Sequence, residues 1–110
     1  MYEVKMNQRT VLDQQIRTWS RDVYNCNILE VEAGTNGPRG GNSSYGCRCY
    51  LRIEDVAGSN IVCKPLSDGG FELMMGGDTE LDTLIEALKF AVNVLEDERR
   101  ECSQYGKYEV

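Results

Sequence analysis

Two stretches of the chain repeat their apolar residues at the spacing of an amphipathic helix. The first runs over residues 10–23, with a stripe of Leu12, Ile16, Trp19 and Val23 and with Thr10 as a suitable N-terminal cap. Trp19, in register with this stripe, is expected to anchor the core. The second stretch follows Gly76 and Gly77, begins at Asp78 or Thr79, and carries Leu81, Leu84, Leu88, Ala91 and Leu95. The pattern therefore predicts two helices.

Other stretches alternate apolar and polar residues, as strands do. We expect strands at residues 26–33, 46–55, 61–64 and 71–75, and a short strand or ordered arm at Tyr2, Val4 and Met6. In the first of these strands Leu29, Val31 and Ala33 face one side. In the second, Cys47, Cys49, Leu51 and Ile53 should face inward, and Arg48, Tyr50, Arg52 and Glu54 outward. Because the connections are short, the strands should form one sheet. The sequence thus predicts a single α+β domain, residues 1–110, in which an antiparallel sheet of four to five strands packs against two helices.

The net negative charge of the chain limits the ligands that it is expected to bind. The chain has 12 basic and 18 acidic residues, a net charge of −6, so duplex nucleic acid is not an expected ligand. A small anion remains possible, because it needs two or three local donors. The apolar runs are too short to cross a membrane, and the first residues lack the apolar stretch of a secretion signal. We expect a protein of the cytoplasm.

The five cysteines are expected to be free thiols, since an odd number without a secretion signal argues against a disulfide framework. Cys47 and Cys49 are the nearest approach to a metal motif, but their spacing is not that of zinc ligands and the chain has no histidine. We expect them to be small core residues, and we expect no metal and no cofactor.

The sequence offers little chemistry for catalysis. Histidine, the commonest general base, is absent, no serine lies in a nucleophile elbow, and no cysteine has a histidine partner. A hydrolase that uses carboxylates alone is the remaining enzymatic alternative. We therefore expect a binding protein.

The connection at residues 34–45 is much longer than a hairpin requires, and residues 34–46 include Gly34, Gly37, Gly40, Gly41 and Gly46. Glycine lets main-chain N–H groups approach an anion or a base edge, and Arg39 adds a guanidinium. A phosphate-binding turn of the dinucleotide type is excluded, because that turn leads into a helix. The alternatives are a binding loop and a flexible tip without function. Arg48 and Arg52, with Tyr50 between them, either extend the binding surface or pair with Glu30 and Glu32 on a solvated face.

The segments Val31-Glu32-Ala33-Gly34-Thr35-Asn36-Gly37, Gly40-Gly41, Arg48-x-Tyr50-x-Arg52-Ile53 and Gly76-Gly77-Asp78-x-Glu80-Leu81-Asp82 resemble those of the Thoeris anti-defence sponges of phages. The resemblance implies a small antiparallel sheet with helices, assembly into dimers or hexamers, and sequestration of cyclic ADP-ribose isomers or cyclic oligonucleotides. By residue type it also implies that Phe71, Asn93, Arg99 and Arg100 contact the signal.

The leading hypothesis is a phage protein that holds a cyclic nucleotide immune signal in the host cytoplasm without converting it. The expected ligand contacts are Gly34, Thr35, Asn36, Gly37, Arg39, Gly40, Gly41, Asn42, Ser43, Arg48, Arg52, Phe71, Asn93, Arg99 and Arg100. The alternatives are an acidic protein that inhibits a host nuclease or defence complex, and a structural accessory of a phage particle or replication complex. The tail at residues 105–110 is expected to become ordered on a partner.

Overall fold

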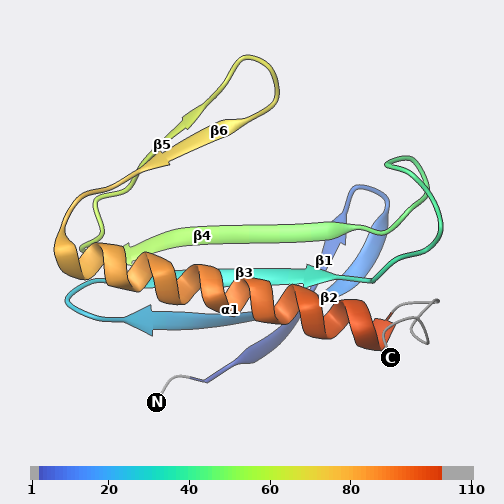
Figure 1. Cartoon of the computed structure of the whole chain (residues 1–110), viewed down its shortest axis with the longest axis horizontal. Helices are drawn as coiled ribbons and strands as arrows, with labels where there is room; N and C mark the ends of the chain where they lie inside the picture. Colours follow the sequence, from blue (N-terminus) through green and yellow to red (C-terminus); the bar gives the residue numbers. More distant parts are fainter. Residues whose placement is uncertain (1–2, 103–110) are drawn as a thin grey trace.

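The computed structural model describes residues 3–102, and in this part of the chain it has an α+β fold (Figure 1). The elements are β1 (Lys5–Val11), β2 (Gln14–Tyr24), β3 (Ile28–Thr35), β4 (Cys49–Ala57), β5 (Val62–Pro65), β6 (Phe71–Met74) and α1 (Asp78–Cys102). The first four strands form an antiparallel sheet in the order β1-β2-β3-β4, and β5 and β6 form a separate antiparallel pair. That pair, the β5–β6 hairpin, projects away from the sheet (Figure 1).

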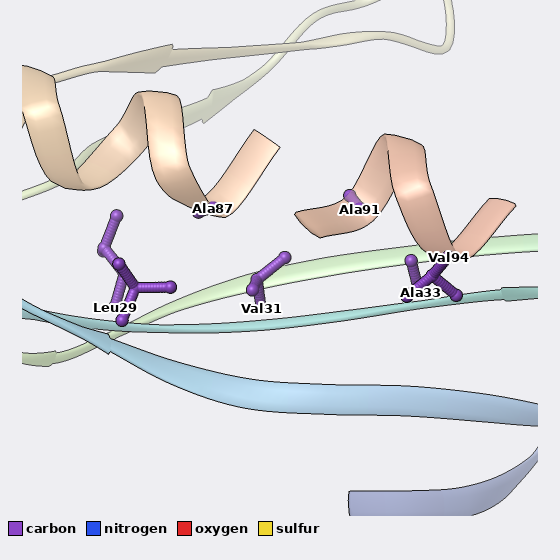
Figure 2. Packing of buried hydrophobic residues seen from close by; sticks show 7 residues of the cluster. Leu29, Val31, Ala33, Ala87, Ala91 and Val94 are labelled. Atoms are coloured by element: carbon purple, nitrogen blue, oxygen red, sulfur yellow. The ribbon is translucent and has the colours of Figure 1, made fainter. Parts of the chain in front are cut away.

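The core lies between β3 and α1 (Figure 2). Leu29, Val31 and Ala33 alternate along β3, as predicted, and all three are fully buried. Above them Ala87, Ala91 and Val94 lie on one face of α1, and Val23 of β2 completes the cluster. The small alanines allow the helix to approach the sheet closely, while each large apolar side chain buried here contributes about 1.5–3 kcal/mol.

The helix predicted at residues 10–23 is wrong: these residues form the end of β1, a turn at Leu12 and Asp13, and most of β2. Both faces of β2 are covered, and one of them is polar. Thr18 and Ser20 are buried on one face, while Trp19 packs against the core from the other. Apolar residues therefore do not alternate along this strand, and their spacing imitates a helix. Two helices were expected, and the described residues contain α1 alone.

Helix α1 confirms the second predicted helix, but its buried face differs from the predicted stripe. Thr83, Ala87, Ala91, Val94 and Glu98 are buried, whereas Leu81 and Leu88 are 56% and 43% exposed. The single predicted sheet is also wrong, because β5 and β6 pair with each other and not with β4.

Cys47 and Cys49 do not belong to the core. Cys47 is half-buried and Cys49 is exposed, because α1 packs chiefly on β3 and covers little of β4. All five cysteines are free thiols. The predictions for Tyr2 and for residues 105–110 lie outside the described residues. Within residues 3–102, α1 is not apolar enough along its length to cross a membrane.

Candidate ligand-binding loop

Residues 36–48, here called the glycine loop, connect β3 to β4 and are closed at their base by hydrogen bonds. The hydroxyl of Thr35 donates to the carbonyl of Arg48 (2.8 Å) and accepts from the amide of Gly37 (3.2 Å). The amide of Arg48 donates to the side-chain oxygen of Asn36 across 2.8 Å. Thr35 and Asn36, both predicted as ligand contacts, therefore support the loop and have these groups engaged.

The interior of the glycine loop is filled by the side chain of Arg48, which is 3% exposed. Its Nη1 donates to the carbonyls of Ser43, Gly46 and Cys47 at 3.1–3.4 Å, and its Nη2 donates to the carbonyl of Ser44 at 2.9 Å. A planar guanidinium has five N–H donors in a rigid fork and can satisfy acceptors on several sides, whereas a lysine ammonium has three donors at a single point. The prediction that Arg48 faces outward is wrong. Sequence reasoning predicted that Arg48 contacts the ligand, whereas in the structure its side chain supports the loop.

Asp13 and Gln14 hold the glycine loop against the β1–β2 turn. The Nε of Arg48 donates to Asp13 Oδ1 across 2.8 Å, and the side-chain amide of Asn36 donates to Gln14 Oε1 across 3.0 Å. The hydrogen bond from Arg48 lowers the pKa of Asp13 and outweighs the opposing effect of burial. Sequence reasoning missed both residues because they fell within the wrongly predicted helix.

Two glycines are required by close packing inside the loop. A Cβ on Gly46 would lie 2.6 Å from the carbonyl oxygens of Gly41 and Asn42, and one on Gly41 would collide with the ring of Tyr45. Asn42 shapes the same turn: its carbonyl accepts from the amides of Tyr45 and Gly46, and its side chain accepts from Ser44. The loop is therefore a structured turn and not an open arc of chain.

What the loop leaves free is a row of main-chain donors. The amides of Arg39, Gly40, Gly41, Asn42 and Ser43 have no hydrogen-bond acceptor within residues 3–102. In the same part of the chain the half-buried guanidinium of Arg39 has no ion pair. Residues 40–45 are exposed. This arrangement presents several N–H donors and one positive charge to solvent, which is the donor set that an anionic oxygen requires.

Gly34, also predicted as a contact, lies outside this row. It is buried in β3, and a Cβ there would come within 2.5 Å of the carbonyl oxygen of Arg17 and within 2.9 Å of Thr18 Cα. Gly34 is thus needed for the close approach of β2 and β3. Of the predicted loop contacts, Arg39, Gly40, Gly41, Asn42 and Ser43 are the ones with donors that remain open.

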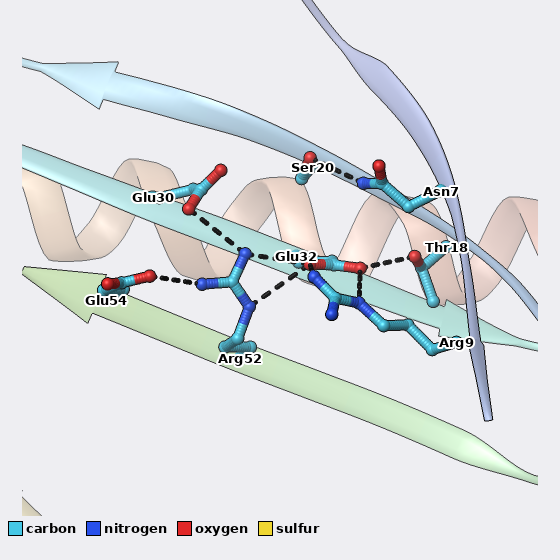
Figure 3. Close-up of polar contacts among 8 residues, drawn as sticks. All are labelled: Asn7, Arg9, Thr18, Ser20, Glu30, Glu32, Arg52 and Glu54. Carbon is cyan, nitrogen blue, oxygen red and sulfur yellow. Dashed lines mark hydrogen bonds and ion pairs between the residues drawn. The ribbon is translucent and has the colours of Figure 1, made fainter. Parts of the chain in front are cut away.

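Arg52 takes part in an ion-pair network on the face of the sheet opposite α1 (Figure 3). It donates to Glu32 (2.9 Å), Glu30 (3.1 Å) and Glu54 (2.5 Å). Arg52 therefore pairs with Glu30 and Glu32, which is the second of its two predicted roles. All three guanidinium nitrogens donate to carboxylates of this network. Tyr50 lies on the same face, with the guanidinium of Arg9 5.6 Å from its ring centre.

Glu32 is the centre of this network and is fully buried. Arg9 binds both of its carboxylate oxygens, at 2.6 and 2.7 Å, and the hydroxyl of Thr18 donates across 2.5 Å. Burial alone would raise the pKa of Glu32, but hydrogen bonds from Arg9, Thr18 and Arg52 outweigh it and lower the pKa to about 2. A carboxylate held this firmly in its charged form is not suited to be a general acid or base near neutral pH.

The contacts inferred from the resemblance lie on other elements. Phe71 is 63% exposed on the β5–β6 hairpin, and Arg99 and Arg100 are exposed in the last turns of α1, where Arg100 pairs with Asp97. The end of α1 and the glycine loop lie toward the same end of the molecule (Figure 1). No hydrogen bond or ion pair joins these three residues to the glycine loop within residues 3–102.

Asn93 borders a separate cavity of about 290 Å³ between β2 and α1. Its walls include Trp19, Phe90 and Arg17, and three carboxylates, Asp97, Glu98 and Glu101, also line it. Arg17 and the indole N–H of Trp19 both donate to Glu98, and these bonds lower the pKa of Glu98 against the opposing effect of burial. With three carboxylates and one guanidinium, this cavity does not favour a phosphate.

Comparisons with known proteins leave the family open. A scan against protein-family models, a search of curated proteins and a search of solved structures each found no match to this chain. The resemblance to the phage sponges therefore stays a prediction, and the geometry of the chain carries the functional argument.

Proposed function

We propose that this chain is a non-catalytic binding protein that captures a small phosphate-bearing nucleotide on the glycine loop. The observation that carries the proposal is the row of open amides at residues 39–43 beside the unpaired Arg39, among the residues described. Arg48 fixes the opposite side of the same turn, so the donors are held in place before a ligand arrives. Preorganisation of this kind reduces the entropy lost on binding.

The resemblance supplies the class of nucleotide. On that basis we propose a cyclic nucleotide immune signal, a cyclic ADP-ribose isomer or a cyclic oligonucleotide, that a phage protein sequesters in the host cytoplasm to block antiviral defence. Tyr45 is 66% exposed on the loop and offers an aromatic face on which a base could stack. A sponge needs to hold its ligand without changing it, and the open donors at residues 39–43, which are main-chain amides and the guanidinium of Arg39, do not gain or lose protons near neutral pH.

Thermal-shift and calorimetric titrations test the proposal, with cyclic ADP-ribose, a cyclic dinucleotide, ADP and inorganic phosphate as probes. A bound probe at a hundredfold excess over its Kd should stabilise the chain by about 2.7 kcal/mol. Arg39→Ala should weaken binding roughly 10- to 100-fold through the loss of one charge-assisted contact. Lys64→Ala, which removes an exposed cation on β5, is the matched control and should bind normally.

The fate of the ligand separates a sponge from an enzyme. After heat denaturation of the complex the nucleotide should be recovered intact, as measured by chromatography and mass spectrometry. A hydrolysed product would contradict the non-catalytic proposal. If none of the probes raises Tm and a host protein co-purifies instead, the acidic-inhibitor hypothesis would replace this one.

A further inference from the structure

Two thiols lie side by side where the glycine loop ends and β4 begins. The sulfur atoms of Cys47 and Cys49 are 3.9 Å apart. Cys49 is the first residue of β4 and is exposed, and Cys47 is half-buried in the loop. Residues two apart along an extended chain point to the same side, so the main chain holds both thiols on one surface. Because neither side chain belongs to the core, core packing does not account for this pair.

The spacing of the pair lies at the upper limit for a disulfide. Two steps along an extended chain separate Cα atoms by about 6.4–6.8 Å. A disulfide joins Cα atoms that are about 4.4–6.8 Å apart. Cys47 and Cys49 can therefore close a ring if the chain tightens at Arg48 between them. Strand β4 lies at the edge of the sheet and pairs with β3 alone, so no second strand opposes this movement. A disulfide formed under strain is readily reduced again.

The two thiols differ in access and in acidity. Cys49 is exposed and is the first to meet a dissolved oxidant. Burial, together with the charge of a neighbouring Cys49 thiolate, raises the pKa of the Cys47 thiol. The effect of that charge disappears once the sulfur of Cys49 has reacted and is neutral. The pair thus combines an accessible thiol with a second thiol beside it that can resolve the product, which is the arrangement of redox-sensitive cysteines.

We propose that Cys47 and Cys49 form a reversible redox site, which a low-molecular-weight disulfide such as oxidised glutathione converts to an intramolecular disulfide. The thiolate of Cys49 attacks one sulfur of the oxidant and releases a glutathione thiolate. Cys47 then loses its proton to solvent, attacks the Sγ of Cys49 and releases a second glutathione thiolate. The two cysteines lose two protons and two electrons, and the oxidant takes up both and becomes two thiols. Excess reduced glutathione reverses the exchange.

The site lies at the base of the glycine loop, where it can act on the loop. The carbonyl of Arg48 accepts from the hydroxyl of Thr35, and its amide donates to Asn36, both across 2.8 Å. Thr35 Oγ1 also lies 3.7 Å from the sulfur of Cys49. Tightening the chain at Arg48 displaces these main-chain groups, so the disulfide should loosen the base of the loop. The redox site does not depend on the proposed ligand, because its formation and its effect are measured without a nucleotide.

Mass spectrometry tests whether the ring forms. After treatment with oxidised glutathione and alkylation of the remaining thiols, chymotrypsin cleaves after Tyr45 and Tyr50 and releases residues 46–50, which contain Cys47, Cys49 and no other cysteine. This peptide should carry no alkyl group and be lighter than the dithiol form by two hydrogen atoms. After reduction it should take up two alkyl groups. Cys63→Ser, which removes an exposed thiol on β5, is the matched control and should yield the same peptide.

Hydrogen exchange tests the effect on the loop. The amides of Gly37 and Gly46 are bonded within the loop, to Thr35 and Asn42. Oxidation of the wild-type chain should make both amides exchange about tenfold faster or more, and dithiothreitol should restore the original rates. Cys47→Ser can form only a mixed disulfide at the exposed Cys49, so its exchange rates should not respond to the oxidant. This variant separates the effect of the ring from that of an adduct.

Two results would overturn the proposal. One is a peptide 46–50 in which Cys49 carries glutathione or a sulfinic acid while Cys47 is alkylated, since Cys47 would then not resolve the first product. The other is a ring that leaves the exchange of Gly37 and Gly46 unchanged, since the disulfide would then form without acting on the loop. The wild-type chain provides both measurements, so the outcome does not depend on whether a variant folds.

Discussion

The Nε of Arg48 donates to Asp13 Oδ1 across 2.8 Å, and this bond ties the glycine loop to the turn between β1 and β2. The remaining guanidinium nitrogens of Arg48 bind carbonyls of the loop. One side chain thus determines both where the loop lies and how it is folded.

Arg48→Lys should loosen the loop, although Arg48 is not proposed to touch a ligand. An ammonium group cannot reach Asp13 and the loop carbonyls at the same time. We expect Tm to fall by about 5 °C or more and the amides of Tyr45 and Gly46 to exchange faster with solvent, as measured by hydrogen exchange. Arg99→Lys, at an exposed site on α1, is the control. Unchanged exchange rates would show that the loop does not need the guanidinium.

Gly46→Ala should disrupt the loop by steric conflict. The added methyl group would press on main-chain atoms of Gly41 and Asn42, which cannot rotate away as a side chain could. We expect a loss of stability of about 1–3 kcal/mol in urea denaturation and loss of nucleotide binding. Gly76→Ala, where a Cβ meets no atom within 4 Å, should leave both unchanged. Equal effects at the two positions would contradict the packing argument.

Stability at acid pH should depend on Glu32. The folded-state pKa of about 2 lies below the ordinary value of 4.5, so the stabilisation is complete above pH 4.5 and is lost as the pH falls towards 2. The shift corresponds to about 3 kcal/mol. The difference in unfolding free energy between the wild type and Glu32→Gln should shrink by that order between about pH 5 and about pH 2.

Urea titrations over this pH range measure the difference. Glu96→Gln, at an exposed helix position, controls for the loss of one negative charge. A wild-type advantage over Glu32→Gln that stays constant with pH would mean that Glu32 is not held in its charged form by Arg9 and Arg52.

Leu12→Gly should stabilise the chain. Leu12 has a φ of 58° in the β1–β2 turn and is 79% exposed, so it adopts a conformation that favours glycine and gains little from packing. We expect a gain of about 1 kcal/mol, seen as a Tm several degrees higher. Leu66→Gly, at another exposed leucine whose φ is not positive, should not stabilise the chain. A lower Tm for Leu12→Gly would show that the leucine side chain matters more than the strain.

Sequence reasoning correctly predicted the elements in which one face is apolar and buried and the other face is polar. Strand β3 is buried against α1 on one face and has charged residues on the other, so Leu29, Val31 and Ala33 alternate plainly. Strand β2 has a polar buried face, where Thr18 contacts Glu32, and its pattern could not be told from that of a helix. The stripe on α1 was misplaced because the helix carries two apolar faces, and the sequence does not say which one the sheet covers.

Sequence reasoning identified the candidate loop but did not predict the orientation of its side chains. Glycine spacing and length identified the connection after β3. They could not show that Arg48 turns into it, because that depends on Asp13, which lies 35 residues away in the sequence. Arg52 could be assigned in advance to either of two roles. The structure decides between them, because Glu32 lies directly opposite Arg52 in the sheet and Glu30 lies within hydrogen-bond distance of it.

Arg48 draws carbonyl oxygens of Ser44 and Gly46 towards its guanidinium, so these acceptors of the turn point inward. The amides of residues 39–43 belong to other peptide groups, have no acceptor in the described part of the chain, and are left for solvent. A chain with a net charge of −6 can in this way carry a small region of positive potential, independent of its overall charge. A large polyanion would still be repelled by the net negative charge of the protein, so the protein would select its ligands by size as well as by charge.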